Sequence, residues 1–234
     1  MGGTAAKNIA KISTTTGAPV PTFWNAAPGR VNHIEAVNGH LLLGGNVTAY
    51  LKSVSPVTGR SDGLTVPAIS GKYVFPGAGS NSTKVYNMSV HGNRVLVMGV
   101  FIQVGGLSRK QIFMLNVPAG PGAATVDPWY SPEFNSDCSG SHPFWLQDAA
   151  WSPDGATVYT ATTGYKPWQK SASLPRSELC DSAAAFSSGP SSLQVHKWIN
   201  YTGCNSLFSV AADADTVYVG GHQIWMNNPL GCPQ

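Results

Sequence analysis

Charged side chains are scarce in this sequence, and it also lacks long apolar runs and clusters of basic residues. Only 11% of the 234 residues are charged, and the net charge is +3. Because Lys and Arg never form a run, the sequence argues against a nucleic-acid partner. The longest apolar runs fall far short of a membrane-spanning helix, so no membrane span is expected. No secretion signal begins at Met1, which leaves a cytosolic protein or a mature or excised piece of a longer one.

Sequence motifs of common catalytic sites are also missing. We find no G-x-S-x-G, no H-E-x-x-H, no phosphate-binding P-loop and no dinucleotide-binding glycine motif. No C-x-x-C pair suggests a zinc site. Enzymatic activity therefore stays uncertain, with a non-enzyme favoured, and no cofactor is expected.

Cysteine is rare, with four residues in the chain, and each lies in a turn-rich stretch. Disulfides fit that setting, and they imply an oxidising compartment, hence a secreted or cell-surface location. Four cysteines allow three pairings. We favour Cys138 with Cys180 and Cys204 with Cys232, because each pair then brackets one of the repeats described next. Four free thiols are the alternative.

Glycine (26 residues) and proline (17 residues) are plentiful, and they punctuate a repeat. Each copy has two stretches of alternating apolar and polar residues around a polar turn, which is typical of a β-hairpin. No helical periodicity competes with this pattern, so the sequence predicts an all-β fold. The four copies are VNHIEAVNGHLLLGG from Val31, VYNMSVHGNRVLVMG from Val85, LQDAAWSPDGATVYT from Leu146 and LFSVAADADTVYVGG from Leu207.

Glycine pairs at Gly44-Gly45 and Gly105-Gly106 precede a predicted third strand near Leu51 or Ile112, and a weaker fourth strand follows. Four antiparallel strands per repeat make a β-propeller blade. We therefore predict one domain, 1–234, either as four blades closed by the termini or as a four-blade window of a larger propeller. The Ser-, Gly- and Pro-rich residues 163–191 are expected to form a surface loop. The blades are expected at about 31–75, 84–131 and 145–203, with a composite of 206–234 and 2–25.

The segments FIQVGGLSRKQIFMLNVPAG and MGGTAAKNIAKISTTTG resemble the repeat of secreted bacterial propellers of the kelch-like, delta-60-repeat family. VYVGGHQIWMNNP, from Val217, is similar to a later portion of those proteins. The resemblance implies an extracellular propeller, often joined to other domains of a longer chain, and says little of function. NVTAYLKS, from Asn46, lacks the family's Phe-Thr-x-Val-x-Gly run, so the first repeat departs from the pattern.

Three side chains of the predicted first strands are weak catalytic candidates. His33 and Glu35 share one face of their strand, and Asp148 lies on the first strand of the third repeat. In a propeller these strands line the central channel, where paired carboxylates could act as acid and base or bind Ca²⁺. The alternative is that they are polar residues wetting a solvent-filled channel.

Aromatic residues near turns are the better candidates for ligand binding. Tyr165 and Trp168 lie in TGYKPWQK, where they could stack on a sugar ring or grip a partner protein. His222 follows a Gly-Gly pair close to Trp225 and could donate a hydrogen bond beside that ring. A structural role at the end of a sheet is the alternative for His222.

Three functions remain open. The first is a non-catalytic extracellular module that binds a protein or a glycan through the loops of one face. The second is a carbohydrate-active enzyme, a lyase or hydrolase, using the channel residues. The third is a structural repeat piece of a larger cell-surface or secreted protein.

Overall fold

A computed structural model of the chain describes residues 5–24, 27, 29–75, 79–80, 82–135, 138, 142–165 and 179–231. The predicted all-β class is confirmed: the only helix in these ranges is one 3-10 turn, η1 (Pro132–Asn135). No helix in the same residues is long and apolar enough to cross a lipid bilayer.

Sheet I is a hairpin extended by a third strand, in the order β1 (Val31–Val37), β2 (His40–Gly45) and β3 (Leu51–Val54). The turn residues Asn38 and Gly39 have φ of 48° and 83°, a left-handed conformation that Asn and Gly adopt at low cost. The hairpin turn and the start of β3 lie where the sequence predicts them.

Sheets II, III and IV are built from the next three repeats. The repeats thus give antiparallel sheets, and sheets II and III have the four strands expected of each repeat, whereas in the described residues sheet I has three and sheet IV two. Sheet II has the order β14 (Thr125–Val126), β12 (Ile112–Asn116), β9 (Arg94–Val100) and β8 (Lys84–His91). Sheet III has the order β15 (Trp145–Trp151), β16 (Thr157–Thr163), β17 (Ser182–Ser187) and β18 (His196–Tyr201), and sheet IV pairs β19 (Leu207–Ala212) with β20 (Val217–Gly221).

The surface loop predicted for residues 163–191 is wrong in its C-terminal part. Residues 182–187 form β17, an inner strand of sheet III. The reason is the short apolar run Ala183–Phe186, which is buried and pairs with strands on both sides.

Short strands connect and flank the larger sheets. One small sheet has the order β11-β10-β5, β4 pairs in parallel with β13, and β6 pairs with β7. Their bounds are β4 (Leu64–Thr65), β5 (Ile69–Ser70), β6 (Val74–Phe75), β7 (Gly79–Ser80), β10 (Gln103–Val104), β11 (Leu107–Ser108) and β13 (Gly122–Ala123).

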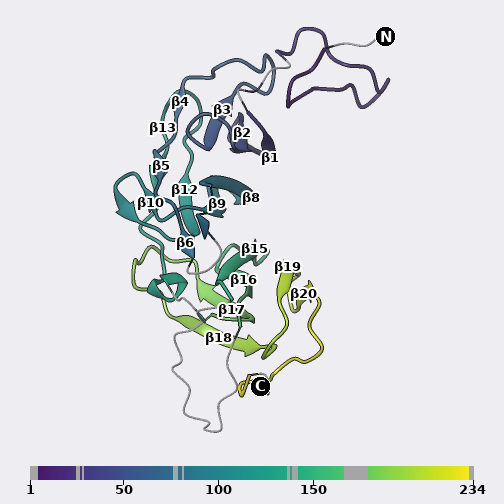
Figure 1. Ribbon diagram of the computed structural model, residues 1–234. Coiled ribbons are helices and arrows are strands. Elements are labelled where there is room, and N and C mark those ends of the chain that lie inside the picture. The colour runs from purple at the N-terminus through teal and green to yellow at the C-terminus, as the bar shows by residue number, and fades with distance from the viewer. Residues whose placement is uncertain are drawn as a thin grey trace.

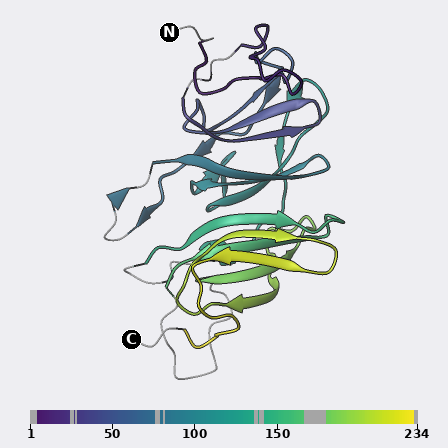
Figure 2. The ribbon, with the colours of Figure 1, turned by 90° about the vertical axis from the view of Figure 1, so that its right-hand side faces the viewer.

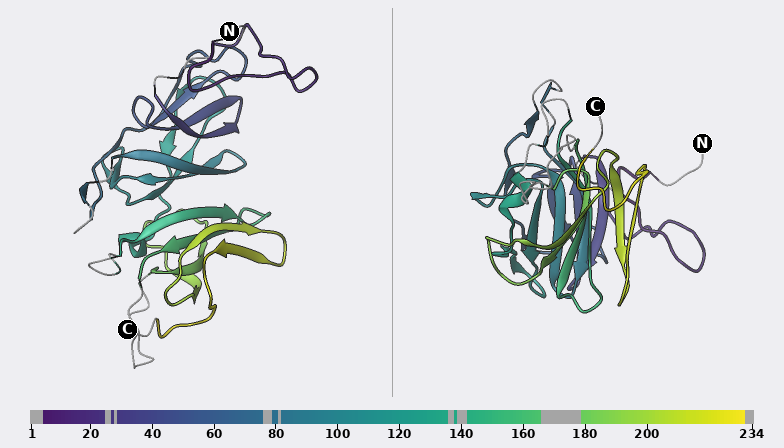
Figure 3. Two further views of the ribbon diagram at one scale, coloured as in Figure 1. Left: turned by 45° about the vertical axis from the view of Figure 1, so that its right-hand side comes forward. Right: turned by 90° about the horizontal axis from the view of Figure 1, so that it is seen from below.

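The four main sheets follow one another in a row from the N-terminal to the C-terminal end (Figures 1 and 2). Their first strands are neighbours: β1 contacts β8, β8 contacts β15, and β15 contacts β19. Seen from below, the strands of successive sheets run alongside one another (Figure 3). The first strand of every repeat therefore lies along one side of the row.

Apolar cores fill the spaces between successive sheets, because alternate residues of a strand face opposite neighbours. In β9, Val95 and Val97 pack toward sheet I, whereas Leu96 and Met98 pack toward sheet III. Burying each such side chain contributes about 1.5–3 kcal/mol. The space between sheets II and III also holds the large buried rings of Trp129, Phe134, Phe144 and Phe186, and a smaller core of Ala161, Ala183, Leu207 and Val210 joins sheets III and IV.

The N-terminal segment packs on the free face of sheet I. Ile9 and Phe23 join Leu43 and Val54 in a separate apolar cluster. In the described residues this segment does not pair with β19–β20, which lies toward the opposite end of the row (Figure 1). Within the described parts of residues 206–234 and 2–25 the predicted composite blade does not form, because the N-terminal segment packs on the apolar face of sheet I.

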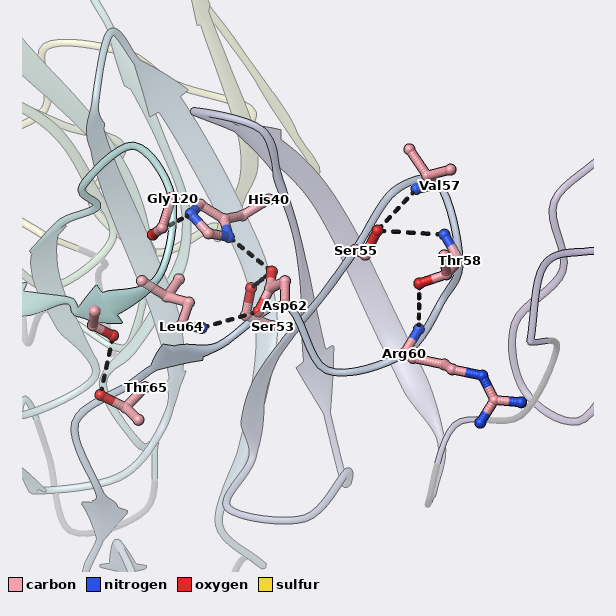
Figure 4. A network of polar contacts seen from close by, with 11 residues as sticks. His40, Ser53, Ser55, Val57, Thr58, Arg60, Asp62, Leu64, Thr65 and Gly120 are labelled. Carbon is pink, nitrogen blue, oxygen red and sulfur yellow. Dashed lines mark hydrogen bonds and ion pairs between the residues drawn. The ribbon is translucent and has the colours of Figure 1, made fainter.

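A buried polar network joins sheets I and II (Figure 4). His40 Nδ1 lies 2.7 Å from Asp62 Oδ2, and His40 Nε2 lies 3.1 Å from the Gly120 carbonyl oxygen. Ser53 Oγ and the Leu64 amide also donate to the Asp62 carboxylate. Burial raises the pKa of Asp62, but these donors and the His40 charge outweigh it and leave the pKa below its ordinary value.

Candidate functional site

Each first strand contains a β-bulge at the same place in the repeat. In β1, Val31 pairs with Gly45 while His33 pairs with Gly44, so one extra residue lies between them. The other first strands show the same shift. A bulge turns its extra side chain away from the regular alternation, and bulges often accompany binding sites for this reason. The extra residues, called bulge residues below, are Asn32, Tyr86, Gln147 and Phe208.

In three of the four hairpins the residue opposite the bulge is a glycine, where the two backbones approach closely; in sheet III the equivalent residue is Thr162. A Cβ on Gly45 would lie 2.1 Å from the Arg30 carbonyl oxygen, and one on Gly99 would lie 2.2 Å from that of Lys84. Gly221 and the Ser206 carbonyl repeat this arrangement in sheet IV at 2.2 Å. The last glycine of GHLLLGG and of VYVGG thus leaves room for the bulged backbone opposite it. The same backbone carries the side chains of the surface beside the bulge.

Three hollows lie along this surface, which we call the bulge face. Hollow A, of about 420 Å³, is lined by Arg30, Val31, Asn32, Asn46, Lys84 and Tyr86. Hollow B, of about 450 Å³, is lined by Lys84, Tyr86, Val100, Trp145 and Gln147. Hollow C, of about 360 Å³, is lined by His142, Pro143, Trp145, Thr163, Gly164, Tyr165, Asp181, Cys204, Ser206 and His222. Lys84 and Tyr86 border both A and B, and Trp145 borders both B and C.

The hollows are lined by equivalent positions of the four repeats. Three bulge residues line hollows A and B, and the fourth, Phe208, stacks on His222 with ring centroids 5.3 Å apart. The residue two positions earlier in each repeat also lines a hollow. We call these four the edge residues: Arg30, Lys84, Trp145 and Ser206.

Two aromatic rings of the bulge face are fixed by neighbours. The Tyr86 hydroxyl donates a hydrogen bond to the Leu146 carbonyl oxygen. Burial, and secondarily the Asp148 charge, raises the pKa of the Tyr86 phenol, so it remains a donor at physiological pH. Trp145 packs edge-on against Tyr73, with ring centroids 5.2 Å apart. These rings can receive a ligand without first losing much rotational freedom.

Hollow C brings together two of the residues predicted to bind a ligand. Tyr165 and His222 both line it, although 57 residues separate them. The Tyr165 ring lies 5.0 Å from that of His142, between centroids. Asp181, only 1% exposed, accepts a hydrogen bond from Ser206 Oγ. Hollow C thus combines aromatic rings with hydrogen-bonding groups at the junction of sheets III and IV.

The other two predicted ligand-binding residues lie elsewhere. Trp225 is 60% exposed and does not line any of the three hollows. Trp168 lies outside the described residues.

The weak catalytic candidates lie on the first strands, as predicted, but their polar groups are engaged. His33 Nε2 lies 3.0 Å from Glu35 Oε1. Asp148 accepts hydrogen bonds from Asn87 Nδ2 and from the amides of Ala149 and Val210, which tie β8, β15 and β19 together. Burial is the main cause of the raised pKa of Asp148, and these donors only partly offset it. This geometry gives Asp148 a structural task.

No group of three or more His, Cys, Asp or Glu side chains in the described part of the chain is placed to hold a metal ion. The Ca²⁺ site considered for the central channel is therefore not supported by a cluster of such side chains in the described residues.

The disulfide predicted between Cys138 and Cys180 is confirmed. It anchors the segment before β15 to the segment before β17, beside hollow C. Cys204 is also disulfide-bonded, and its predicted partner, Cys232, lies outside the described residues.

Comparison of the chain with protein-family models, with curated proteins and with solved structures finds no match. The case for a function therefore depends on the geometry of the bulge face.

Sequence reasoning missed the edge and bulge residues, although the aligned repeats contain them. They stand immediately before and after the first apolar residue of each copy, Val31, Val85, Leu146 and Leu207. Their residue types differ from copy to copy, whereas the residue between them is always Val or Leu. When the four repeats are aligned, an apolar position that stays Val or Leu lies between two positions whose residue type varies. This contrast is the signal that could have identified the edge and bulge residues.

Proposed function

We propose that this protein is a non-catalytic extracellular binding module that recognises a glycan along its bulge face. The observation that carries the proposal is the series of rings and polar side chains along three neighbouring hollows. Tyr86, Trp145 and Tyr165 offer aromatic surfaces, on which sugar rings stack. Asn46, Gln147 and Ser206 offer hydrogen-bonding groups for hydroxyls beside them.

A propeller architecture is part of the same proposal. Repeated antiparallel sheets with neighbouring first strands support it, because a propeller also places its first strands innermost and packs each blade against the next. We propose that the four sheets are successive blades, in a window of a larger ring, and that the bulge face belongs to one end of that ring.

The extracellular location rests on cysteine chemistry. Disulfides persist in oxidising compartments and are rare in the cytosol. Cys138–Cys180 and the bonded Cys204 both border the region of hollow C, so oxidation would help to shape the proposed site.

A glycan array tests the proposal. We expect the wild-type protein to bind a restricted set of polysaccharides, and Trp145→Ala or Tyr165→Ala to weaken that binding at least tenfold through loss of stacking area. Trp225→Ala is the matched control, since this exposed tryptophan lies outside the hollows.

Circular dichroism must first show that each variant is folded. Absence of any glycan ligand for the wild-type protein would refute the proposal. Equal loss of binding in Trp225→Ala would move the site away from the bulge face.

A protein ligand is the second candidate, favoured by apolar side chains exposed on and after sheet IV. Phe208, Tyr218, Ile224 and Trp225 are each at least half exposed. Such clusters often mark protein contacts. A protein ligand at this place would lose affinity in Trp225→Ala and keep it in Tyr165→Ala, the reverse of the glycan expectation.

A further inference from the structure

We infer that hollows A and B select acidic polysaccharides, with Arg30 and Lys84 contacting the acidic groups of successive sugar units. This inference rests on the proposed function and names the chemical class of its ligand. It comes from the edge residues, whose order along the row is cation, cation, aromatic ring and hydroxyl.

Both cations are available for a ligand. Arg30 immediately precedes β1 and Lys84 begins β8, so equivalent backbone positions of two adjacent sheets present them. In the described residues neither side chain has a hydrogen bond or an ion pair. Arg60, by contrast, stacks on Trp24, and Arg94 pairs with Asp127.

The lining of hollows A and B leaves this positive charge uncompensated. The residues that line them include no Asp or Glu within the described ranges. Asn32 is held in place because its side-chain Nδ2 donates to the Val85 carbonyl oxygen, so it bridges sheets I and II in the lining of hollow A. Uncompensated cations in a concave surface favour an anionic ligand, and the guanidinium of Arg matches the two oxygens of a carboxylate or sulfate.

The remaining lining fits a sugar better than a free anion. Tyr86 lies between the two hollows, and Trp145 closes the far side of hollow B. A chain that runs from hollow A to hollow C would meet these two charges and the three aromatic rings of Tyr86, Trp145 and Tyr165. We therefore expect acidic units over Arg30 and Lys84, and a ring stacked on Trp145.

The test compares three immobilised polysaccharides at low salt: a polyuronate, a sulfated polysaccharide and a neutral glucan. The protein should come from a host that does not attach N-glycans, because Asn46 of the sequon Asn46-Val47-Thr48 borders hollow A. We expect one or both acidic polymers to bind at least tenfold more tightly than the glucan. The stronger of the two identifies the acidic group as carboxylate or sulfate.

Lys84→Gln and Arg30→Gln should each weaken binding of the acidic polymer roughly tenfold, the cost of one charge-assisted contact, and should flatten its dependence on salt. Lys52→Gln is the matched control, because Lys52 lies in β3 and lines neither hollow. Preferred binding of the glucan, or an equal loss in Lys52→Gln, would overturn acid selection while leaving glycan binding intact. Failure of all three polymers and of the glycan array would remove the proposed function itself.

Discussion

Asp62 and His40 show how a few residues make the stability of this protein sensitive to acid. Both side chains are buried, and the Asp62 carboxylate accepts hydrogen bonds from groups on β3 and at the start of β4. Its pKa lies below the ordinary value of 3.8 because these donors and His40 outweigh the effect of burial. The folded state therefore holds the Asp62 proton less tightly than the unfolded chain does.

We predict that Asp62 stabilises the fold fully above pH 3.8 and that this contribution disappears as the pH falls through the lowered folded-state pKa. Urea unfolding of the wild type and of Asp62→Asn should show a difference in midpoint that stays constant from neutral pH down to about pH 4 and shrinks as the pH falls further. A difference that is independent of pH would mean that the carboxylate charge does not stabilise the network.

This network could not be predicted from the sequence. His40 contacts Asp62 and Gly120, which are 22 and 80 residues away along the chain. The hairpin pattern explains why His40 begins β2, but no local rule says which residues a neighbouring turn will place against its ring. Long-range side-chain partners depend on how the sheets stack.

The β-bulge is the feature that matters at the scale of a strand. It takes the bulge residues out of the regular alternation of the strand, and in sheets I, II and IV it lies opposite a glycine. A side chain at that glycine would displace the backbone that carries Arg30 or Lys84.

We predict that Gly45→Ala lowers the free energy of unfolding by about 1–3 kcal/mol, as overpacking commonly does. The new Cβ would lie 2.1 Å from the Arg30 carbonyl oxygen. Gly189→Ala is the matched control, because its nearest neighbour, Ser187 Oγ, is at an ordinary 3.5 Å. Chemical denaturation measures both variants, and equal stability of the two would show that the bulge tolerates a side chain.

The sequence predicts hairpins well and bulges poorly, for a physical reason. Turn residues such as Asn38 and Gly39 are chosen for backbone angles that other residues adopt at a cost, so they mark hairpin turns. An extra residue in a strand only shifts the alternation of apolar and polar residues by one position, and that alternation is imperfect in these strands even without the bulge. The glycine pair at Gly44-Gly45 is visible, but its purpose becomes clear only beside the Arg30 carbonyl.

For the whole molecule, the row of sheets determines where the structure opens first. Sheets II and III each have a neighbour on both sides, whereas sheet IV has two strands in the described residues and packs on sheet III through a small core. In stacked repeats, each unit depends mainly on contacts with its neighbours.

We predict that backbone amides of β19 and β20 exchange with solvent much faster than those of β9 and β12, because exchange follows local opening. Hydrogen–deuterium exchange read by mass spectrometry measures this difference in the free protein. Uniform protection along the row would show instead that the chain opens only as a whole.

The stacking of sheets was predictable from repeat spacing, but the fate of the N-terminal segment was not. Its spacing resembles a third strand, which suggested pairing with the last hairpin. In the structure, Ile9 and Phe23 cover sheet I, whose outward face carries Leu43 and Val54. Sequence periodicity shows which segments could pair as strands. Which segments do come together depends also on which exposed apolar faces they can cover.

Hollow C lies across the seam between sheets III and IV, with Tyr165 on one side and His222 on the other. A molecule seated there would bind only while the terminal hairpin is docked, so its binding energy would oppose detachment of that hairpin. A ligand bound in hollow C would thus hold sheet IV against sheet III. Its presence would be detected as slower amide exchange in β19 and β20.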